Sequence, residues 1–409
     1  MSEFANEGAE PPLTGVRVLE LGNYIAAPTT GRLLGDFGAE VVKIERPGAG
    51  DELRRWRLAE GDTSMLWRTL ARNKLSVTLD LKSDEGREIA LSLVEQCDVV
   101  IENMRPGALE GLGLGVEQLA ERRPDLVLVR ISGYGQDGPY RKRAGFGGVA
   151  EALGGLRHLT GYPDRPPTRL GVSLGDTVAG MYGALGAVMA LLGRRPDRPR
   201  VEVVDVALYE AVFSLTESMV PEFDAYGLVR ERTGTTLPGV VPSNTYRCAD
   251  GSWVVIGGNA DAVFRRLMHV IERPDLADDP ELADNRGRSR YPELLDTAIG
   301  SWTEQHPLAV VLDTLEANGV PSGAIYDAAD IGKDPHFEAR EMLLPVEVEV
   351  APGRHREVRF PGIVPKLSRR PGSLRWLGPE LGAHTRSVLG DLLGLGEAEL
   401  AELAAKGVI

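Results

Sequence analysis

Asp176 is the residue whose position in the chain best fits covalent chemistry. It follows Gly175 and precedes an uncharged run rich in Ala, Gly, Leu and Met, which predicts a buried helix from Thr177 to Leu192. The first N–H groups of that helix would face the carboxylate and stabilise negative charge beside it. Asp is also a common N-cap, so position alone favours a structural role. The glycines at 171 and 175 allow a ligand to approach the backbone closely, which keeps catalysis open.

Two other motifs are interpreted as coincidental. The run Gly133-Tyr134-Gly135-Gln136-Asp137-Gly138 matches the dinucleotide pattern and follows a predicted strand, but Pro139 comes next where a helix should begin. We therefore predict a glycine turn there. Ser173 lies in a G-x-S-x-G run, yet Pro163, Pro166 and Pro167 forbid the central strand that a hydrolase nucleophile requires. The six histidines are scattered, and no motif predicts a metal or ATP site.

Composition places further bounds on the function. A chain of 409 residues predicts two domains, and a net charge of −14 argues against general nucleic-acid binding. We find no uninterrupted apolar stretch long enough for a bilayer, and Met1 to Pro12 reads as a loose tail rather than a secretory signal. Cys97 and Cys248 cannot form a disulfide framework and suit a reducing cytoplasm. These features predict a soluble cytoplasmic protein that binds neither membranes nor nucleic acid.

The first half of the chain alternates strand and helix patterns, as in an α/β fold with a Rossmann-like parallel sheet. One helix is predicted over Ser83–Gln96, with Ser83 as N-cap. Ligands of such sheets bind at the carboxyl ends of the strands. The predicted strands are Val16–Leu21, Val41–Glu45, Ser76–Leu79, Val99–Glu102, Leu126–Ile131 and Glu202–Val206.

The later part of the chain predicts a second, smaller domain. A helix is predicted from Leu208 to about Met219, and after it the pattern becomes loop-like and then α+β. We place the large domain at 1–225, a small α+β domain at 226–329, and a C-terminal segment at 330–409 that returns to the large domain. That segment carries predicted strands near Val346–Val350 and Glu357–Phe360 and a helix around His384–Leu393.

Several motifs together resemble the class III CoA-transferases, the family of formyl-CoA and carnitine CoA-transferases that also contains 2-methylacyl-CoA racemases. The resemblance covers nearly the whole chain. The matching runs are 13–19 (LTGVRVL), 35–48 (GDFGAEVVKIERPG), Asn73-Lys74, 102–107 (ENMRPG), 132–135 (SGYG), Leu174-Gly175-Asp176 and 381–385 (LGAHT).

The resemblance implies that Asp176 is the nucleophile and that coenzyme A is a substrate, with no tightly bound cofactor. It also implies an interlocked homodimer of ring-shaped chains. The implied chemistry forms an aspartyl-CoA thioester and exchanges one acid for another. The candidate sources of oxyanion donors are the glycine-rich segment near Asp176 and the run Gly145-Phe146-Gly147-Gly148. The implied coenzyme A contacts are Ile25, Ala26, Arg46, Leu79, Lys82, Asn103, Met104, Arg105, Arg143, Ala144, Gly145 and Phe146.

Two alternatives remain beside this prediction. A racemase of the same fold needs a His base where this chain has Phe146, which cannot take a proton. A CoA-binding protein without catalysis would not need Asp176. The acceptor acid is open: Arg157, Arg165 and Arg169 could clamp the second carboxylate of a short dicarboxylic acid, with succinyl-CoA as donor, or they could be surface charges.

Overall fold

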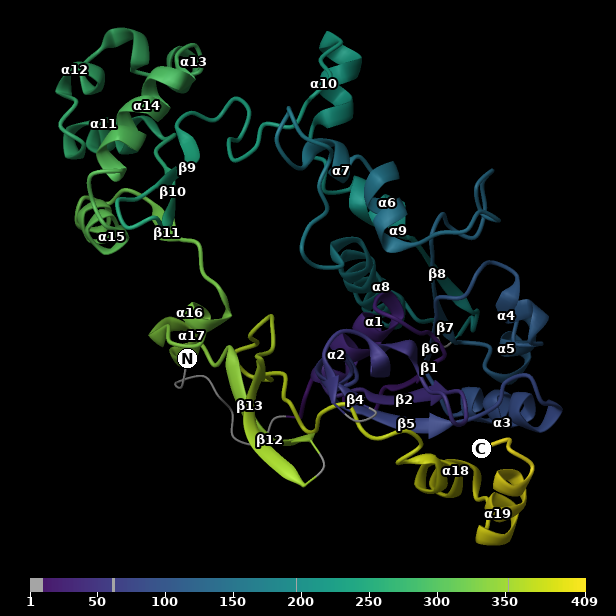
Figure 1. The fold of residues 1–409 in the computed structure, drawn as a ribbon. Coiled ribbons are helices and arrows are strands. Elements are labelled where there is room, and N and C mark those ends of the chain that lie inside the picture. The colour runs from purple at the N-terminus through teal and green to yellow at the C-terminus, as the bar shows by residue number, and fades with distance from the viewer. Residues whose placement is uncertain (1–9, 61–62, 196, 352) are drawn as a thin grey trace. The chain divides into compact units, whose positions relative to one another are not determined.

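The computed structural model describes residues 10–60, 63–195, 197–351 and 353–409, so most of the predicted Met1–Pro12 tail lies outside the described residues. The chain divides into two compact units (Figure 1). The first unit comprises Met1–Leu156, Leu170–Ser218 and Glu338–Ile409. The second comprises Arg157–Arg169 and Met219–Phe337. Each unit has a hydrophobic core of its own.

A six-stranded parallel sheet forms the centre of the first unit. Its strands lie in the order β5-β2-β1-β6-β7-β8, and every neighbouring pair is parallel. This order confirms the predicted α/β fold with a Rossmann-like sheet. The strands are β1 (Arg17–Glu20), β2 (Glu40–Glu45), β5 (Lys74–Thr78), β6 (Val99–Glu102), β7 (Val127–Ser132) and β8 (Glu202–Ala207).

Chain direction reverses across the sheet between β1 and β6. From β1 the chain adds β2 and then β5 on one side, and afterwards β6, β7 and β8 on the other. The loops that leave β1 and β6 therefore diverge and open a crevice at their carboxyl ends. The segments after Glu20 and after Glu102 both border that crevice.

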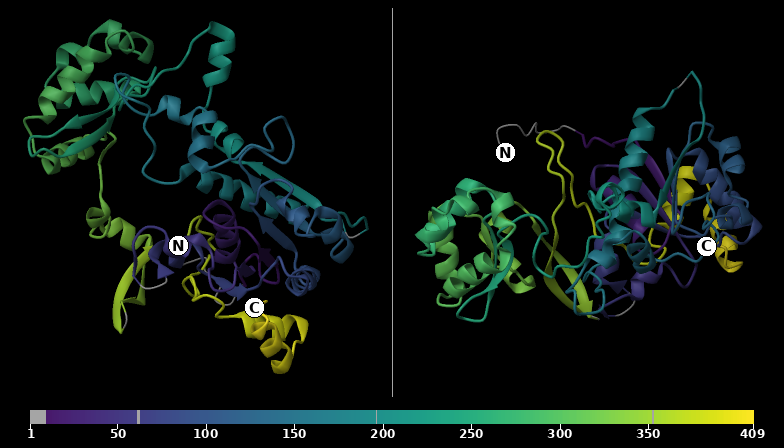
Figure 2. Two further views of the ribbon diagram at one scale, coloured as in Figure 1. Left: turned by 45° about the vertical axis from the view of Figure 1, so that its right-hand side comes forward. Right: turned by 90° about the horizontal axis from the view of Figure 1, so that it is seen from above.

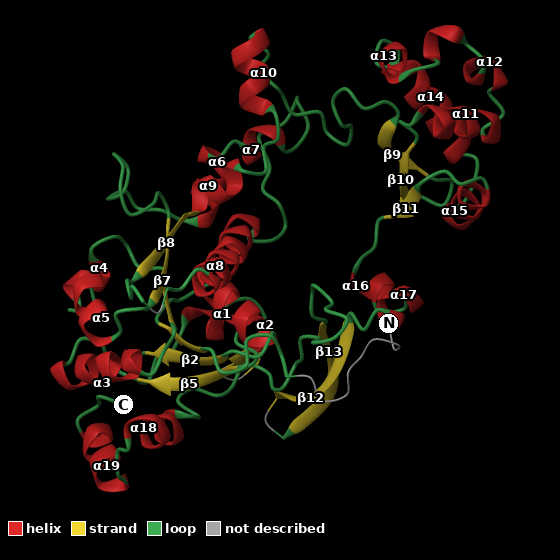
Figure 3. Cartoon of the chain, turned by 180° about the vertical axis from the view of Figure 1, so that it is seen from behind, coloured by secondary structure: helices red, strands yellow, loops and turns green. Residues whose placement is uncertain are grey.

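Helices cover both faces of the sheet, as the buried runs of the strands require. One face packs against α1 (Ala26–Asp36), α6 (Gly147–Leu153), α8 (Leu174–Leu192) and α9 (Leu208–Phe213). The other packs against α3 (Asp84–Glu95), α4 (Ala108–Gly111), α5 (Val116–Arg122), α18 (Thr385–Leu393) and α19 (Glu397–Ala405). Figure 3 shows α1 and α8 on one side of β2 and β5, with α18 and α19 on the other.

Small residues let α8 pack closely on its neighbours. A Cβ at Gly180 would lie 2.6 Å from the Ala26 carbonyl oxygen, and one at Gly186 would lie 2.4 Å from Val204. The Thr30 hydroxyl donates to the Gly180 carbonyl at 2.9 Å, which joins α1 to α8. By length and composition α8 would qualify as a membrane span, which the sequence analysis had not found. In the structure this helix packs on α1, β7 and β8.

Three predictions on the helices are corrected. α8 begins at Leu174, with Ser173 as its N-cap, so Asp176 lies in the first turn and is not the cap. Only the Gly and Ala face of α8 is buried, while Met181, Leu185 and Met189 are exposed. The helix predicted from Leu208 ends at Phe213, because side-chain hydroxyls after it bond to the backbone, and α10 (Met219–Tyr226) follows as a separate helix.

The rest of the first unit consists of shorter elements. After β2 come a 3-10 turn (Glu52–Arg55), the strand pair β3 (Ala59–Glu60) and β4 (Thr63–Ser64), and α2 (Met65–Leu70). Near the C-terminus β12 (Leu343–Ala351) and β13 (Arg354–Pro361) form an antiparallel ribbon, yellow-green in Figure 2. This ribbon contains the two strands predicted there.

The second unit is a small α+β assembly. Its antiparallel sheet has the order β11-β10-β9, formed by β9 (Ser243–Arg247), β10 (Trp253–Gly257) and β11 (Ser322–Ala324). Buried side chains of these strands pack against the surrounding helices. The main helices are α11 (Asp261–Val270), α12 (Pro274–Ala277), α13 (Asn285–Arg288), α14 (Pro292–Thr303) and α15 (Leu308–Ala317). Shorter helices are α7 (Leu156–Leu159), α16 (Ala328–Ile331) and α17 (Pro335–Ala339), of which α7 and α17 cross the unit boundaries.

Candidate active site

A cavity of about 530 Å³ lies within the first unit at the crevice between β1 and β6. Its wall is built from the segments that follow β1, β2, β6 and β7, together with the starts of α8 and α9. The lining residues are Tyr24, Ile25, Ala26, Trp56, Asn103, Met104, Arg105, Pro106, Ile131, Ser132, Gly133, Arg141, Arg143, Gly145, Phe146, Gly147, Asp176 and Leu208. Three arginines and one carboxylate face this space, so it suits a polyanionic ligand.

Asp176 reaches the cavity from the first turn of α8. Its carboxylate lies against Gly147, the first residue of α6: a Cβ at that position would be 2.3 Å from Oδ2 of Asp176. The carboxylate is therefore close to the N-termini of two helices, whose first N–H groups have no partner within their own helix. Such groups stabilise the carboxylate and would stabilise an oxyanion formed beside it.

A buried carboxylate on α6 contacts the start of α8. Glu151 is 2% exposed, and its Oε1 accepts the backbone N–H of Gly175 at 3.5 Å. Gly147 and Glu151 are four residues apart, so they lie on the same face of α6. One face of this helix thus contacts both Asp176 and the residue before it.

The segments after β1 and β6 are joined through one side chain. The Asn103 carboxamide accepts the backbone N–H of Asn23 at 2.8 Å and donates to the Asn23 carbonyl at 2.7 Å. It thus replaces a pair of ladder bonds where the strands diverge. Asn103 therefore ties together the two segments that border the crevice.

A second buried contact fixes the loop after β6. The Glu102 carboxylate accepts the Met104 N–H at 2.7 Å and the Arg130 Nε–H at 2.7 Å. Burial raises the pKa of Glu102, and the Arg130 guanidinium opposes that rise. The Glu102 carboxylate therefore holds the loop on which Met104 and Arg105 line the cavity.

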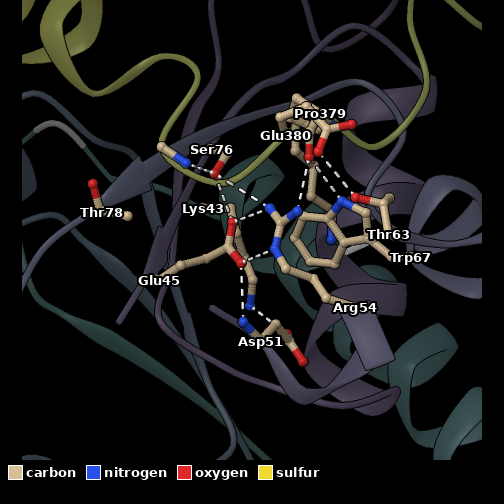
Figure 4. Close-up of polar contacts among 12 residues, drawn as sticks. Lys43, Glu45, Asp51, Arg54, Thr63, Trp67, Ser76, Thr78, Pro379 and Glu380 are labelled. Carbon is tan, nitrogen blue, oxygen red and sulfur yellow. Dashed lines mark hydrogen bonds and ion pairs between the residues drawn. The ribbon is translucent and has the colours of Figure 1, made fainter. Parts of the chain in front are cut away.

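A buried ionic network fixes the loop after β2 (Figure 4). Glu45, at the end of β2, binds Arg54 through two contacts of 2.8 and 2.7 Å and accepts the Ser76 hydroxyl at 2.6 Å. The Arg54 guanidinium also stacks on Trp67, 3.8 Å from the ring centre. These groups are buried, and each charged member has a partner, which is the condition under which buried charge is tolerated.

Lys43 extends this network to the segment after β1. Its Nζ lies 2.9 Å from Asp51 and 3.2 Å from Glu20, and it donates to the Gly22 carbonyl. Burial lowers the pKa of Lys43, but the two carboxylates outweigh burial and raise it above its ordinary value. Lys74 pairs with Glu20 at 2.7 Å, and there burial prevails and lowers the lysine pKa to about 8.

The network places two aromatic rings on the cavity wall. Asp51 accepts the backbone N–H of Tyr24 at 3.2 Å, and Tyr24 has a φ of +64°, a conformation rare for a bulky residue. The rings of Tyr24 and Trp56 are 5.2 Å apart and inclined by 49°. An aromatic pair of this kind offers a face for a planar group such as adenine.

The two ends of the loop from 133 to 146 are in close backbone contact. A Cβ at Gly133 would lie 2.6 Å from the Gly145 Cα, so the two glycines touch through their backbones. The part of the chain from Gly133 to Phe146 contains no helix, which confirms the predicted glycine turn. Likewise the described residues from 154 to 173 contain no strand, which argues against a hydrolase elbow at Ser173.

The structure brings most of the predicted site residues together. Asp176 and eight of the implied coenzyme A contacts line the cavity: Ile25, Ala26, Asn103, Met104, Arg105, Arg143, Gly145 and Phe146. Ala144 lies between two lining residues. Arg46, Leu79 and Lys82 do not line it, and their contact with coenzyme A stays a prediction.

The positions of these three residues have a simple cause. Arg46 is exposed and pairs with Glu52, while Leu79 is buried in the core. Lys82 follows β5, two strands away from β1. The end of β5 is therefore about 10 Å from that of β1, so it borders a different part of the sheet edge. Arg157, Arg165 and Arg169 belong to the second unit, and their role stays a prediction.

Sequence reasoning missed Tyr24, Trp56 and Arg141 as lining residues. Tyr24 and Trp56 lie in loops without a recognisable motif. Arg141 lies in a basic run after Pro139 that matches no binding motif. Among the described residues no group of three His, Cys, Asp or Glu side chains could hold a metal ion.

Comparison with known proteins decides the family. A model described as CoA-transferase family III matches residues 13–385. The chain belongs to CoA-transferase family III. Transfer of CoA between an acyl-CoA and a carboxylic acid is thus the reaction of this protein.

Several relatives of this CoA-transferase have named substrates. A succinyl-CoA–D-citramalate CoA-transferase of Chloroflexus aurantiacus is 48% identical over 400 residues, which cover 97% of this chain and 98% of that protein. The beta subunit of a succinyl-CoA–L-malate CoA-transferase from the same organism is 39% identical, with 97% and 98% covered. A human succinyl-CoA:glutarate CoA-transferase is 31% identical, with 97% and 90% covered.

Solved structures agree with the fold. A CAIB/BAIF family protein from Brucella suis superposes with a TM-score of 0.82 at 30% identity, covering 94% of this chain and all of that chain. A Mycobacterium tuberculosis protein superposes with a TM-score of 0.79 at 27% identity, covering 92% and 99%. The α/β architecture of the CoA-transferase is therefore shared with crystal structures over nearly its whole length.

Proposed function

We propose that this CoA-transferase moves CoA from succinyl-CoA to a short dicarboxylic acid through a thioester on Asp176. The observation that carries the proposal is the place of the Asp176 carboxylate, in a cavity with three arginines and at the start of two helices. The named relatives support the substrate class, since each transfers CoA between succinyl-CoA and a dicarboxylic acid.

The reaction proceeds in two symmetrical halves. An Asp176 oxygen attacks the thioester carbon of the donor, the C–S bond breaks, and CoA leaves as thiolate, which gives a mixed anhydride of Asp176 and the donor acid. The thiolate then attacks the aspartyl carbonyl, which releases the donor acid as carboxylate and leaves an aspartyl-CoA thioester. The acceptor carboxylate attacks that thioester, and the expelled thiolate attacks the acceptor carbonyl of the second anhydride. Asp176 is regenerated, and no ATP is required.

The residues around Asp176 would act by position and by charge. Each tetrahedral step puts negative charge on a carbonyl oxygen, and the backbone near Gly145 and Gly147 offers N–H donors there. The helix N-termini stabilise negative charge on Asp176, which also tempers its nucleophilicity. Alignment of the thioester by the cavity must therefore supply much of the acceleration.

Trapping of the intermediate tests the role of Asp176. The enzyme is mixed with succinyl-CoA without acceptor, quenched in acid and digested. We expect the peptide that contains Asp176 to carry CoA, and borohydride to reduce the same residue to the alcohol. Asp176→Asn should fold normally and give neither product, while Ser173→Ala, at an N-cap without a side-chain bond, should keep both. Product formation with an unmodified Asp176 peptide would exclude covalent catalysis at this residue.

The cavity does not favour a racemase. Phe146 is 60% exposed where the base would be needed, and no histidine is among the described residues that line the cavity. A racemase would exchange the α-proton of a branched acyl-CoA with solvent. We expect no deuterium at that carbon after incubation in heavy water.

The assembly proposed for the enzyme is a homodimer with interlocked chains, in the cytoplasm. The exposed apolar face of α8, formed by Met181, Leu185 and Met189, supports burial against another surface. Cys97 and Cys248 are buried and free, which suits a reducing compartment. Sizing with light scattering should give twice the mass of one chain, and a monomer would contradict the dimer.

A further inference from the structure

Three guanidinium groups line the cavity without a carboxylate partner. Arg105, Arg141 and Arg143 are exposed, and none forms an ion pair within the part of the chain that the structure describes. Some surface arginines elsewhere are paired with carboxylates, as Arg122 is with Glu88 and Arg273 with Asp275. Arginine suits carboxylate and phosphate because its planar fork can donate two parallel hydrogen bonds. The unneutralised charge therefore points to anionic groups of the substrate.

Arg141 and Arg143 differ in their surroundings, although both lie on the loop from 133 to 146. The Arg143 guanidinium stacks on the Tyr140 ring, 3.6 Å from its centre. The backbone N–H of Arg143 donates to the Tyr140 carbonyl. Within the described part of the chain, Arg141 makes no such ring contact. The loop is held by Gly135 N–H on Ser132 Oγ and by Gln136 N–H on Asp205, so its position does not depend on Arg141.

The proposed substrates carry a negative charge in addition to the phosphates that every acyl-CoA carries. The phosphates of coenzyme A are common to all thioesters, and the family resemblance implies Arg105 and Arg143 as coenzyme A contacts. A dicarboxylic acid adds one further carboxylate, which stays free while the other reacts. We propose that Arg141 binds this free carboxylate and so selects dicarboxylic over monocarboxylic substrates. The proposal rests on the proposed function and deepens it.

Specificity constants of Arg141→Gln test this assignment. Succinyl-CoA and butyryl-CoA have the same chain length and differ in the terminal carboxylate. We expect Arg141→Gln to lower kcat/KM for succinyl-CoA by about 30-fold, which is the effect of losing one charge-assisted contact. The kcat/KM for butyryl-CoA should change by less than about threefold. Arg141→Lys should recover part of the loss, because it keeps the charge without the fork.

Matched variants separate the outcomes. If Arg143 and Arg105 bind phosphate, Arg143→Gln and Arg105→Gln should lower kcat/KM for succinyl-CoA and for butyryl-CoA together. Affinities measured on the Asp176→Asn background, which cannot turn over, should show Arg141→Gln weakening succinyl-CoA but not coenzyme A itself. An equal loss of affinity for succinyl-CoA and coenzyme A would show that Arg141 contacts phosphate. An unchanged affinity for both would show that it is a surface cation. Either result overturns the proposal.

The outcome for Arg141 is distinct from that for the nucleophile. A wild-type enzyme that uses butyryl-CoA as well as succinyl-CoA would exclude selection of diacids, yet leave the Asp176 thioester intact. Absence of the thioester with a selective Arg141 effect would exclude the covalent route only.

Discussion

The Asp176 carboxylate lies against the backbone of Gly147, and the contact leaves no room for a side chain at position 147. A Cβ there would be 2.3 Å from Oδ2 and 2.8 Å from Cγ of Asp176. The conflict falls on the carboxylate that is proposed to react, so a side chain could fit only if the carboxylate moved. The glycine thus belongs to the geometry of the proposed nucleophile, although it supplies no reactive atom.

Gly147→Ala should therefore damage catalysis without damaging the fold. Alanine suits the first position of α6 better than glycine does, so we expect an unchanged melting temperature. Displacement of the carboxylate by about 1 Å should lower kcat by about 100-fold. Gly171→Ala is the matched control, because a Cβ there would contact nothing within 4 Å. Normal turnover by Gly147→Ala would mean that Asp176 need not hold this position.

Asn103 offers a test of how the crevice is held open. Asn103→Ala removes both bonds to the Asn23 backbone, which should lower stability by about 1–3 kcal/mol. KM for the acyl-CoA should rise more than kcat falls, since the loops that move bind the ligand and Asp176 is on another element. Asn103→Asp keeps the acceptor and loses the donor, and so should fall between wild type and Asn103→Ala. A variant with unchanged KM would show that the crevice is fixed by other contacts.

The sequence alone predicted the sheet but not where the helix that carries Asp176 begins. The alternation of apolar strands with amphipathic helices determined β1, β2, β6 and β7 to within a residue or two, because each strand is buried on both faces. The start of α8 was placed too late. Glycine and serine are weak helix formers, and only packing of Gly175 against α6 and α9 shows that the helix already includes it.

Only some of the residues that line the cavity could be predicted from the sequence, because strand order decides which loops meet. A motif after each strand suggests a ligand contact, yet strand order decides which strand ends meet. Lys82 follows β5 at the edge of the sheet, whereas Asn103 follows β6 at its centre. Tyr24 and Trp56 reach the cavity through the buried pairing of Lys43 with Asp51, a contact between residues that no local pattern links.

Glu151 provides a test of the second carboxylate near the nucleophile. Glu151→Gln keeps an oxygen for the Gly175 N–H and removes the charge, whereas Glu151→Ala removes both. If the contact serves only to position α8, the Gln variant should keep the kcat of wild type and the Ala variant should lose about tenfold or more. If the charge of Glu151 tunes Asp176, the Gln variant should also shift the pH profile of kcat/KM. Wild-type behaviour of both variants would exclude either role.

His384 should make the attachment of the C-terminal segment dependent on pH. The backbone N–H of Ser76 donates to Nδ1 of His384 at 3.2 Å, so this nitrogen must be unprotonated, and the His384 N–H donates in turn to the Ser76 carbonyl. Burial lowers the pKa of His384 below its ordinary value. The unfolded chain then binds the proton more readily than the folded protein, so this contribution to stability is complete above about pH 6.5 and is lost as the pH falls below it. We expect the melting temperature to drop between about pH 7 and 5. The drop should be smaller in His384→Asn, whose amide oxygen accepts the same N–H without titrating. Parallel curves for the two proteins would exclude His384 as the titrating group.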